Sequence, residues 1–436
     1  ALINGNLPVE SAAEYIRRLR ATGVLTDARH RELLTGHELD LPFLGDVTET
    51  GTGDPGAAPA PYRHDQSDPI VITHSSGTTG LPKAIVHSNS TLFAATRTLR
   101  LSMPKAQGTD RVLSALPAPH TAGILAVNQA LCNRAELLFL SSQAGGHVLS
   151  AIERWQPTGV FGFAVTWSEL ARFDLTKRNL DSVAIWFNTG DSAHEAHIRP
   201  LVAVGSHQEV TREGVRRVAG SGFVDGLGST EMGHSMFHVT HRPGTDRYGR
   251  CIGRPHSFAE VAVLDLDGEY VPDGQVGHLG IKSPTLALGY WHDSVTTYRS
   301  RLRGYYLTGD LVYRDGDGYY YHMDRAVDSV DLGNGERLYT AMSEERILRA
   351  CPDVRDCAVS AVDQDGTVVT DVLLLLDVGA DPELDRRDAV AGALGPAVAA
   401  TLRRVEAVAD DAIPLGATGK IRKLVLRERQ LAGAAS

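Results

Sequence analysis

Hydrophobic and polar positions follow two different periods along the chain. Apolar residues recur at helical spacing from Glu10 to Arg20, and a short strand-like run follows at residues 23–26. From residue 70 to about residue 261, strand-like runs alternate with helical stretches, which is typical of α/β layers. The predicted strands of this region are 69–73, 111–116, 137–140, 159–163 and 183–187.

The pattern changes after residue 259. Short strands separated by Asp-Gly turns occupy residues 259–321 and predict a β-rich subdomain. Beyond Arg325, a helix over 343–350 and strands near 357–362 and 368–376 predict a small α+β unit, followed by a polar end. We therefore expect an α/β protein with a large domain over residues 1–325 and a small domain over residues 326–436.

Composition narrows the classes of protein. A chain of 436 residues is too long for one hydrophobic core, and 42% apolar with 22% charged residues is typical of a soluble globular protein. The net charge of -10 argues against a nucleic-acid surface, and the longest apolar run, 372–376, is too short to span a membrane. The start lacks the features of a signal peptide, and the four cysteines form no C-x-x-C pair. We expect a cytoplasmic protein without disulfides or a zinc knuckle.

The strongest chemical signal is the segment Thr73-His-Ser-Ser-Gly-Thr-Thr-Gly-Leu-Pro-Lys83, directly after a predicted strand. Its glycines let backbone N–H groups approach an anion, its hydroxyls add donors, and Lys83 adds a positive charge. The alternative is a surface turn rich in serine and glycine. The segment is not a Walker A loop, because Leu-Pro follows Gly80. A G-x-G-x-x-G match at residues 51–56 lacks a preceding strand and contains Pro55, so we reject a Rossmann site there.

Residues 75–83 resemble the phosphate loop of the adenylate-forming superfamily, which comprises acyl-CoA synthetases, peptide-synthetase adenylation domains and luciferases. Five further segments are similar to that family's motifs and follow in its order: 225–231, 283–291, 307–310, 324–325 and 417–421. The stretch 225–237 is most similar to benzoate-type aryl-CoA ligases. The resemblance implies ATP and Mg²⁺, a small-molecule acid, and coenzyme A or a phosphopantetheinyl carrier protein as acyl acceptor. It also implies a mobile small domain that turns between two half-reactions.

The resemblance also assigns residues to roles. Lys420 and Thr230 are expected to act at the α-phosphate, and Glu231 to act there and to ligate Mg²⁺, which prefers oxygen ligands. Asp225 is expected at the adenine and Asp310 at the ribose. The predicted nucleotide-binding residues are Ser75, Ser76, Gly77, Thr78, Thr79, Gly80, Lys83, Asp225, Gly226, Leu227, Asp310 and Arg325. The predicted acid pocket contains His120, Gly123, Phe163, Asn188, Gly190, Met232 and Gly233.

Several positions depart from the family pattern. Leu227 replaces a common tyrosine, Val327 stands where a hinge Asp or Lys is usual, and residues 331–336 replace a segment that lines the acceptor tunnel. The family normally has further residues before the equivalent of Ala1. The histidines at 234, 238 and 241 have poor spacing for a metal.

The leading hypothesis is an aryl- or acyl-CoA ligase, with a homodimer left open. A carrier-protein-loading enzyme is one alternative. Another is an enzyme that transfers an AMP-activated acid, including a non-carboxylate oxyacid, to an amine or other nucleophile. A nucleotide-binding regulator without catalysis is the alternative outside the enzymes.

Overall fold

The protein is described by a computed structural model that covers residues 1–37, 39–49, 54–75, 82–102, 110–191, 193–333, 335–416 and 418–434. The predicted loop residues Ser76, Gly77, Thr78, Thr79 and Gly80 lie outside the described residues. None of the described helices is long and apolar enough to cross a membrane.

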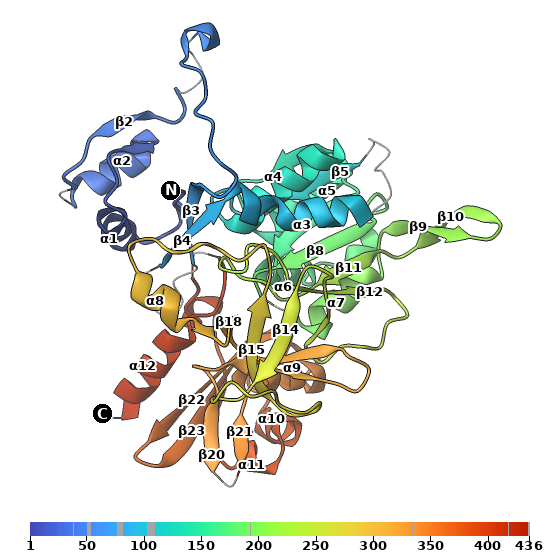
Figure 1. The fold of residues 1–436 in the computed structure, drawn as a ribbon. Coiled ribbons are helices and arrows are strands. Elements are labelled where there is room, and N and C mark those ends of the chain that lie inside the picture. Colours follow the sequence, from blue (N-terminus) through green and yellow to red (C-terminus); the bar gives the residue numbers. More distant parts are fainter. Residues whose placement is uncertain are drawn as a thin grey trace.

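A mixed twelve-stranded sheet forms the body of the molecule (Figure 1). Neighbouring strands β6, β5, β7, β8 and β11 run parallel at one end of the sheet. These strands are β5 (Arg111–Ser114), β6 (Glu136–Phe139), β7 (Gly159–Phe163), β8 (Ile185–Thr189) and β11 (Gly222–Asp225). The helices interspersed with them are α3 (Asn89–Ser102), α4 (Thr121–Asn133), α5 (Gly145–Trp155), α6 (Ala164–Leu170) and α7 (Glu195–Val202). The predicted α/β alternation is confirmed.

The same sheet continues in antiparallel order β12-β13-β19-β18-β15-β14, with β17 paired to β18, and the predicted β-rich stretch 259–321 contains β14, β15, β17 and β18. These strands are β12 (Phe237–His241), β13 (Cys251–Pro255), β14 (Glu260–Leu264), β15 (Gly277–Lys282), β17 (Arg301–Leu302), β18 (Tyr305–Arg314) and β19 (Tyr320–Arg325). A hairpin of β9 (Ser206–Thr211) and β10 (Gly214–Ala219) projects from the body.

Two buried tryptophans hold the centre of the parallel region. The side chains of Trp167 and Trp186 are fully buried and meet edge to face at 5.8 Å between ring centroids. Each indole N–H has a partner: Trp186 donates to Ser221 Oγ over 2.8 Å, and Trp167 donates to Asn188 Oδ1 over 2.7 Å. The core packing therefore fixes Asn188, which lies in β8 beside the loop that follows this strand.

The N-terminal part is a small unit of its own. Its apolar helix face packs Ala13 and Ile16 against Leu34, and Arg20 ends the first helix in a left-handed conformation. Its elements are α1 (Val9–Leu19), β1 (Val24–Thr26), α2 (Ala28–Thr35) and β2 (Phe43–Asp46). A three-stranded sheet of β3 (Pro69–His74), β4 (Ala84–Ser88) and β16 (Gly289–Tyr290) follows, with α8 (Ser294–Arg299) after β16.

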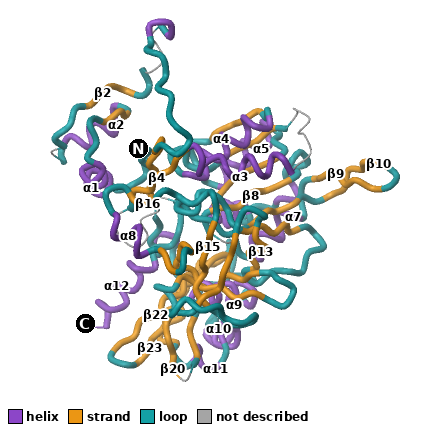
Figure 2. Tube along the Cα trace, viewed as in Figure 1, coloured by secondary structure: helices purple, strands orange, loops and turns teal. Residues whose placement is uncertain are grey.

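The C-terminal residues form a small α+β unit with a core of its own, built around Ile347, Val359 and Val372. Its elements are β20 (Val330–Gly333), β21 (Glu336–Leu338), α9 (Thr340–Ala350), β22 (Val354–Gln364), β23 (Thr367–Leu376), α10 (Arg387–Leu394), α11 (Pro396–Ala399), β24 (Leu402–Ala407) and α12 (Lys423–Ala434). Figure 2 shows α12 at the edge of the molecule opposite the β9–β10 hairpin. The predicted polar end is thus a helix, and the boundary at Arg325 stays a prediction.

Candidate functional site

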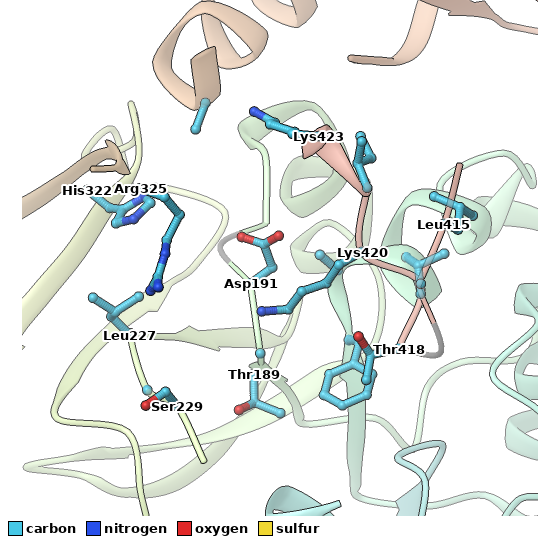
Figure 3. A pocket seen from close by; sticks show the side chains of 18 of the residues that line it. Thr189, Asp191, Leu227, Ser229, His322, Arg325, Leu415, Thr418, Lys420 and Lys423 are labelled. Atoms are coloured by element: carbon cyan, nitrogen blue, oxygen red, sulfur yellow. The ribbon is translucent and has the colours of Figure 1, made fainter. Parts of the chain in front are cut away.

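A cavity of about 410 Å³ lies where the C-terminal segment meets the sheet. Its walls come from the ends of β3 and β4, the start of α4, and the loops that follow β7, β8 and β11. Loops that follow the carboxyl ends of neighbouring strands are the usual ligand site of an open α/β sheet. The loop 418–421 closes the cavity from the side of the small unit (Figure 3).

Asp310 lies buried in β18, and two groups hold the same carboxylate oxygen. His322 Nε2 lies 3.3 Å from Oδ1, and Arg325 Nη1 donates to Oδ1 over 3.0 Å. Asp310 stands directly across from Arg325 in the β18–β19 pairing, which explains why they meet. Burial would raise the pKa of Asp310, but the charge of Arg325 and the contact with His322 hold it well below its usual range. The carboxylate is therefore ionised and fixed in orientation.

The turn that contains Thr230 and Glu231 is fixed through its backbone. Thr230 O accepts from His87 Nε2 over 2.9 Å, and Glu231 O accepts from the N–H of Ala287 over 2.9 Å. Both residues line the cavity, and Glu231 Oε1 accepts from Tyr290 Oη over 3.1 Å.

The donor set of this turn fits a magnesium ion held mainly by a nucleotide. Among the described residues there is no cluster of three or more side chains that could hold a metal by itself. Mg²⁺ commonly takes one or two carboxylates and completes its shell with phosphate oxygens and water. The Glu231 carboxylate at the cavity wall meets that requirement.

Lys420 reaches the cavity from a loop whose backbone strongly favours glycine at residue 419. Gly419 has φ +78°, and a Cβ added there would lie 2.5 Å from Val165 Cγ1. Figure 3 shows the Lys420 side chain extended into the cavity, toward the loop that contains Thr189 and Asp191. Lys420 and the ends of the predicted anion loop, Ser75 and Lys83, therefore share one cavity.

Asp225 ties two loops together. Its Oδ1 accepts from Asn188 Nδ2 over 2.8 Å and from the N–H of Gly226 over 2.7 Å, and Oδ2 accepts from the N–H of Ala193 over 3.3 Å. Burial raises the pKa of Asp225 to about 6, although the hydrogen bonds from Asn188, Gly226 and Ala193 oppose the rise. The observed role of Asp225 is to fasten the loop after β8 to β11, and its predicted contact with adenine stays a prediction.

In two histidines of the cavity wall, a hydrogen bond to the backbone determines which ring nitrogen carries the proton. His120 Nδ1 accepts from the N–H of Ala122 over 3.1 Å, so the proton of a neutral ring is on Nε2. Burial and the nearby charge of Lys420 lower the pKa of His120 to about 3. His234 Nδ1 lies 2.9 Å from the carbonyl O of Ser235, which can only accept, so Nδ1 carries the proton. Burial lowers the pKa of His234, which keeps its ring neutral at neutral pH.

Ionisable groups join the small unit to α7 of the large one. His194 Nδ1 lies 2.6 Å from Glu345 Oε2, and His197 Nε2 donates to the carbonyl O of Arg355 over 2.7 Å. Burial would lower the pKa of His194, but the bond and charge of Glu345 raise it. Burial would raise the pKa of Glu345, but His194 lowers it. The two side chains form an ion pair.

A second junction surrounds the residue before Arg325. Asp324 accepts hydrogen bonds from Thr340 N and from Thr340 Oγ1, the latter over 2.9 Å. Lys423 Nζ donates to Thr340 Oγ1 over 2.6 Å and pairs with Glu344 at 2.9 Å. The carboxylate of Asp324, in β19, is therefore bound to the first turn of α9.

The structure brings most of the described predicted residues to this cavity. Those that line it are Ser75, Lys83, His120, Phe163, Gly190, Leu227, Thr230, Glu231, Gly233, Asp310, Arg325 and Lys420. Gly123, Asn188, Asp225, Gly226 and Met232 are not among the lining residues. Met232 instead packs in the core with Phe237 and Ile252, and a Cβ on Gly123 would lie 2.5 Å from the carbonyl O of Pro117.

Further lining residues were not predicted, among them Arg250 and His322. For His322 a signal existed, because it precedes the Asp324-Arg325 motif by two residues and so lies on the same strand face as Asp324.

Comparisons with known proteins agree with this geometry. The family described as AMP-binding enzyme matches residues 2–291. The chain is 46% identical to 3-aminoavenalumate diazotase of a Streptomyces species, over 98% of this chain and 80% of that protein. It is 28% identical to the medium/long-chain-fatty-acid–CoA ligase FadD8 of Mycobacterium tuberculosis, over 84% of this chain and 62% of the ligase. The crystal structure of the anthranilate CoA ligase AuaEII shares the fold with a TM-score of 0.83 at 22% identity, over 99% of this chain and 83% of that one. The chain therefore belongs to the AMP-binding enzyme family, as its six motifs predict.

Proposed function

We propose that this enzyme adenylates a small oxyacid, nitrite, and passes the activated nitrogen to the amine of an aryl substrate. The reaction would be an ATP-dependent diazotisation. The observation that carries the proposal is the 46% identity to a diazotase over 98% of this chain, whereas a CoA ligase reaches 28%. Activation of a non-carboxylate oxyacid for an amine is one of the hypotheses that the altered segment 331–336 leaves open.

In the first half-reaction, an oxygen of the acid attacks the α-phosphorus of ATP, and pyrophosphate leaves. The position of Lys420 in the cavity supports a role in neutralising charge that develops on the phosphoryl oxygens. The ionised Asp310 is suited to accept from the ribose hydroxyls, because His322 and Arg325 both contact Oδ1. Mg²⁺ held by Glu231 and the phosphates would neutralise charge on the departing pyrophosphate.

Nitrite needs such activation at neutral pH because hydroxide is a poor leaving group from nitrogen. In the mixed anhydride of nitrite and AMP, the nitrogen is electrophilic and AMP is the leaving group. Attack by the amine forms an N–N bond and breaks the N–O bond to AMP, which leaves with the electron pair. The amine loses a proton to give an N-nitrosamine, whose diazohydroxide tautomer takes up a proton and loses water to give the diazonium ion.

Transfer of an aromatic acyl group to coenzyme A is the second candidate. The benzoate-type stretch 225–237 and the similarity to CoA ligases favour it. Loading of a carrier protein would use the same thiol chemistry. Lys420 and Glu231 in one cavity argue against a regulator that has lost catalysis.

The test compares acids first and acceptors second. Pyrophosphate release is measured with ATP, Mg²⁺ and either nitrite or a panel of aromatic, aliphatic and amino acids. An aryl-amine panel is then added, and the diazonium ion is trapped by azo coupling at a mildly alkaline pH, where free nitrite does not diazotise. Nitrite is expected to release pyrophosphate, and ¹⁵N from nitrite is expected in the dye. Release with an aromatic acid alone, followed by thioester formation with coenzyme A, would establish the second candidate instead.

A further inference from the structure

We propose that His234 accepts the proton from the attacking amine, and that His120, in the same cavity, acts only as a hydrogen-bond donor. The backbone fixes the two rings in opposite tautomers. This inference rests on the proposed amine acceptor and adds to it the group that receives the proton.

The surroundings of His234 hold its ring in one orientation. Nδ1 donates to the carbonyl O of Ser235 over 2.9 Å. Two rings meet His234 edge to face, Phe258 at 5.6 Å and His256 at 5.9 Å between centroids. The preceding Gly233 has φ +69°, and a Cβ there would lie 2.3 Å from the carbonyl O of Thr285, so the backbone at this turn is equally constrained.

The consequence is a lone pair on Nε2 that none of the described residues uses. In a neutral ring whose Nδ1 carries the proton, Nε2 has none and is the basic atom. The His234 side chain lines the cavity that also contains Lys420 and Glu231. An acceptor of protons is therefore present at the wall of the proposed adenylation site.

His120 is the natural competitor for this role, and its geometry excludes it. Its Nδ1 lone pair is used at the start of α4, where it accepts from the N–H of Ala122. The remaining nitrogen, Nε2, therefore carries a proton and can only donate. Lys420 lies close enough to this ring for its charge to help lower the pKa of His120. A donor there suits an oxygen of the bound acid or of AMP.

The proton transfer belongs to the second half-reaction alone. As the amine nitrogen bonds to the electrophilic nitrogen, its N–H becomes acidic; the proton passes to His234 Nε2 while AMP leaves. A positioned base contributes roughly 10²- to 10⁴-fold to such a step. Nitrite is already an anion at neutral pH and has no proton to lose, so the first half-reaction does not need this base.

The test uses His234→Asn to separate the two half-reactions. The amide of Asn can still donate to the carbonyl O of Ser235, but Asn has no atom at the position of Nε2. His238→Ala is the matched control, since His238 is exposed on β12 and stacks on His256 at 4.4 Å without lining the cavity. For His234→Asn, pyrophosphate release with nitrite is expected within about twofold of wild type. Diazonium formed per AMP is expected to fall about 100-fold or more. The control is expected to keep both rates.

Either of two results would overturn the assignment of His234. One is that His234→Asn forms as much diazonium per AMP as the wild type. The other is that pyrophosphate release and diazonium formation fall by the same factor in a His234→Asn variant with an unchanged melting temperature. If the wild type makes no diazonium with nitrite, the proposed function fails by itself. Hydroxylamine, an amine that traps acyl-adenylates of carboxylic acids, then replaces the aryl amine. Loss of hydroxamate per AMP in His234→Asn would support the base, and an unchanged ratio would overturn it.

Discussion

The closing loop offers a quantitative prediction through Gly419→Ala. A residue other than glycine pays about 1–2 kcal/mol for a left-handed backbone, and Gly419 has φ +78°. The new Cβ would also lie 2.5 Å from Val165 Cγ1, an overlap that costs about 1–3 kcal/mol more. Val165 is β-branched in the first turn of α6 and has little rotamer freedom to move away.

Together these terms oppose the closed position of Lys420 by about 2–5 kcal/mol. Since 1.36 kcal/mol is a factor of ten in rate, pyrophosphate formation is expected to slow about 30-fold to 5,000-fold. The melting temperature is expected to stay near that of the wild type, because the loop carries little of the core.

A second substitution divides this loss into its two parts. Val165→Gly removes Cβ, Cγ1 and Cγ2, which would lie 2.9, 2.5 and 3.2 Å from the new Cβ, so Val165→Gly/Gly419→Ala keeps only the backbone term of about 1–2 kcal/mol. The double variant is then expected within about 5- to 30-fold of Val165→Gly alone in a pyrophosphate-release assay. A Gly419→Ala enzyme as fast as wild type would refute the reasoning, and so would a double variant no faster than Gly419→Ala.

Three further predictions follow from the site. Lys420→Ala is expected to slow pyrophosphate release by about 10²- to 10³-fold, measured by steady-state release, while folding is unchanged by circular dichroism. Asp310→Ala is expected to raise the Michaelis constant for ATP about tenfold or more, and an unchanged constant would remove Asp310 from the ribose. In the folded protein the pKa of His194 is raised and the pKa of Glu345 is lowered. Their ion pair therefore stabilises the fold most between pH 4.5 and pH 6.5, the ordinary pKa values of the two groups, and stabilises it less outside this window. The melting-temperature difference between wild type and His194→Gln should therefore be largest in that window and shrink as pH rises through the pKa of folded His194; a constant difference would contradict the ion pair.

Elements with a regular pattern of burial could be predicted from the sequence. Strand β7 was predicted over the residues that the structure shows, because Gly159–Phe163 is almost wholly buried and apolar. Strand β4 was missed, since it includes His87 and Ser88, polar residues whose burial depends on distant partners such as Thr230. Helix α12 was missed for a related reason. Its buried residues include Gln430, which bonds to Ser360 and to the backbone of Val369, so its packed face is not purely apolar.

The site shows the same limit. Lys420, Glu231 and Asp310 lie in segments that resemble known motifs, so they could be proposed from the sequence alone. The contact between Asp310 and Arg325 depends on the register of β18 and β19, and that of His194 with Glu345 joins residues 151 positions apart. Register and long-range docking leave no local pattern. The tautomers of His120 and His234 are likewise set by backbone groups whose direction only the fold determines.

The hydrogen bonds that join Asp324, Thr340 and Lys423 affect how a nucleophile can reach the site. A rotation of the small C-terminal unit about residues 325–327 would separate the carboxylate of Asp324 from the amide and hydroxyl of Thr340. Separating a buried charge from its partners typically costs about 3–5 kcal/mol. In the proposed reaction, an amine that diffuses in while the C-terminal unit stays in place avoids that barrier. A single conformation of the enzyme can then catalyse both proposed half-reactions, which follow one another in time without a change of conformation.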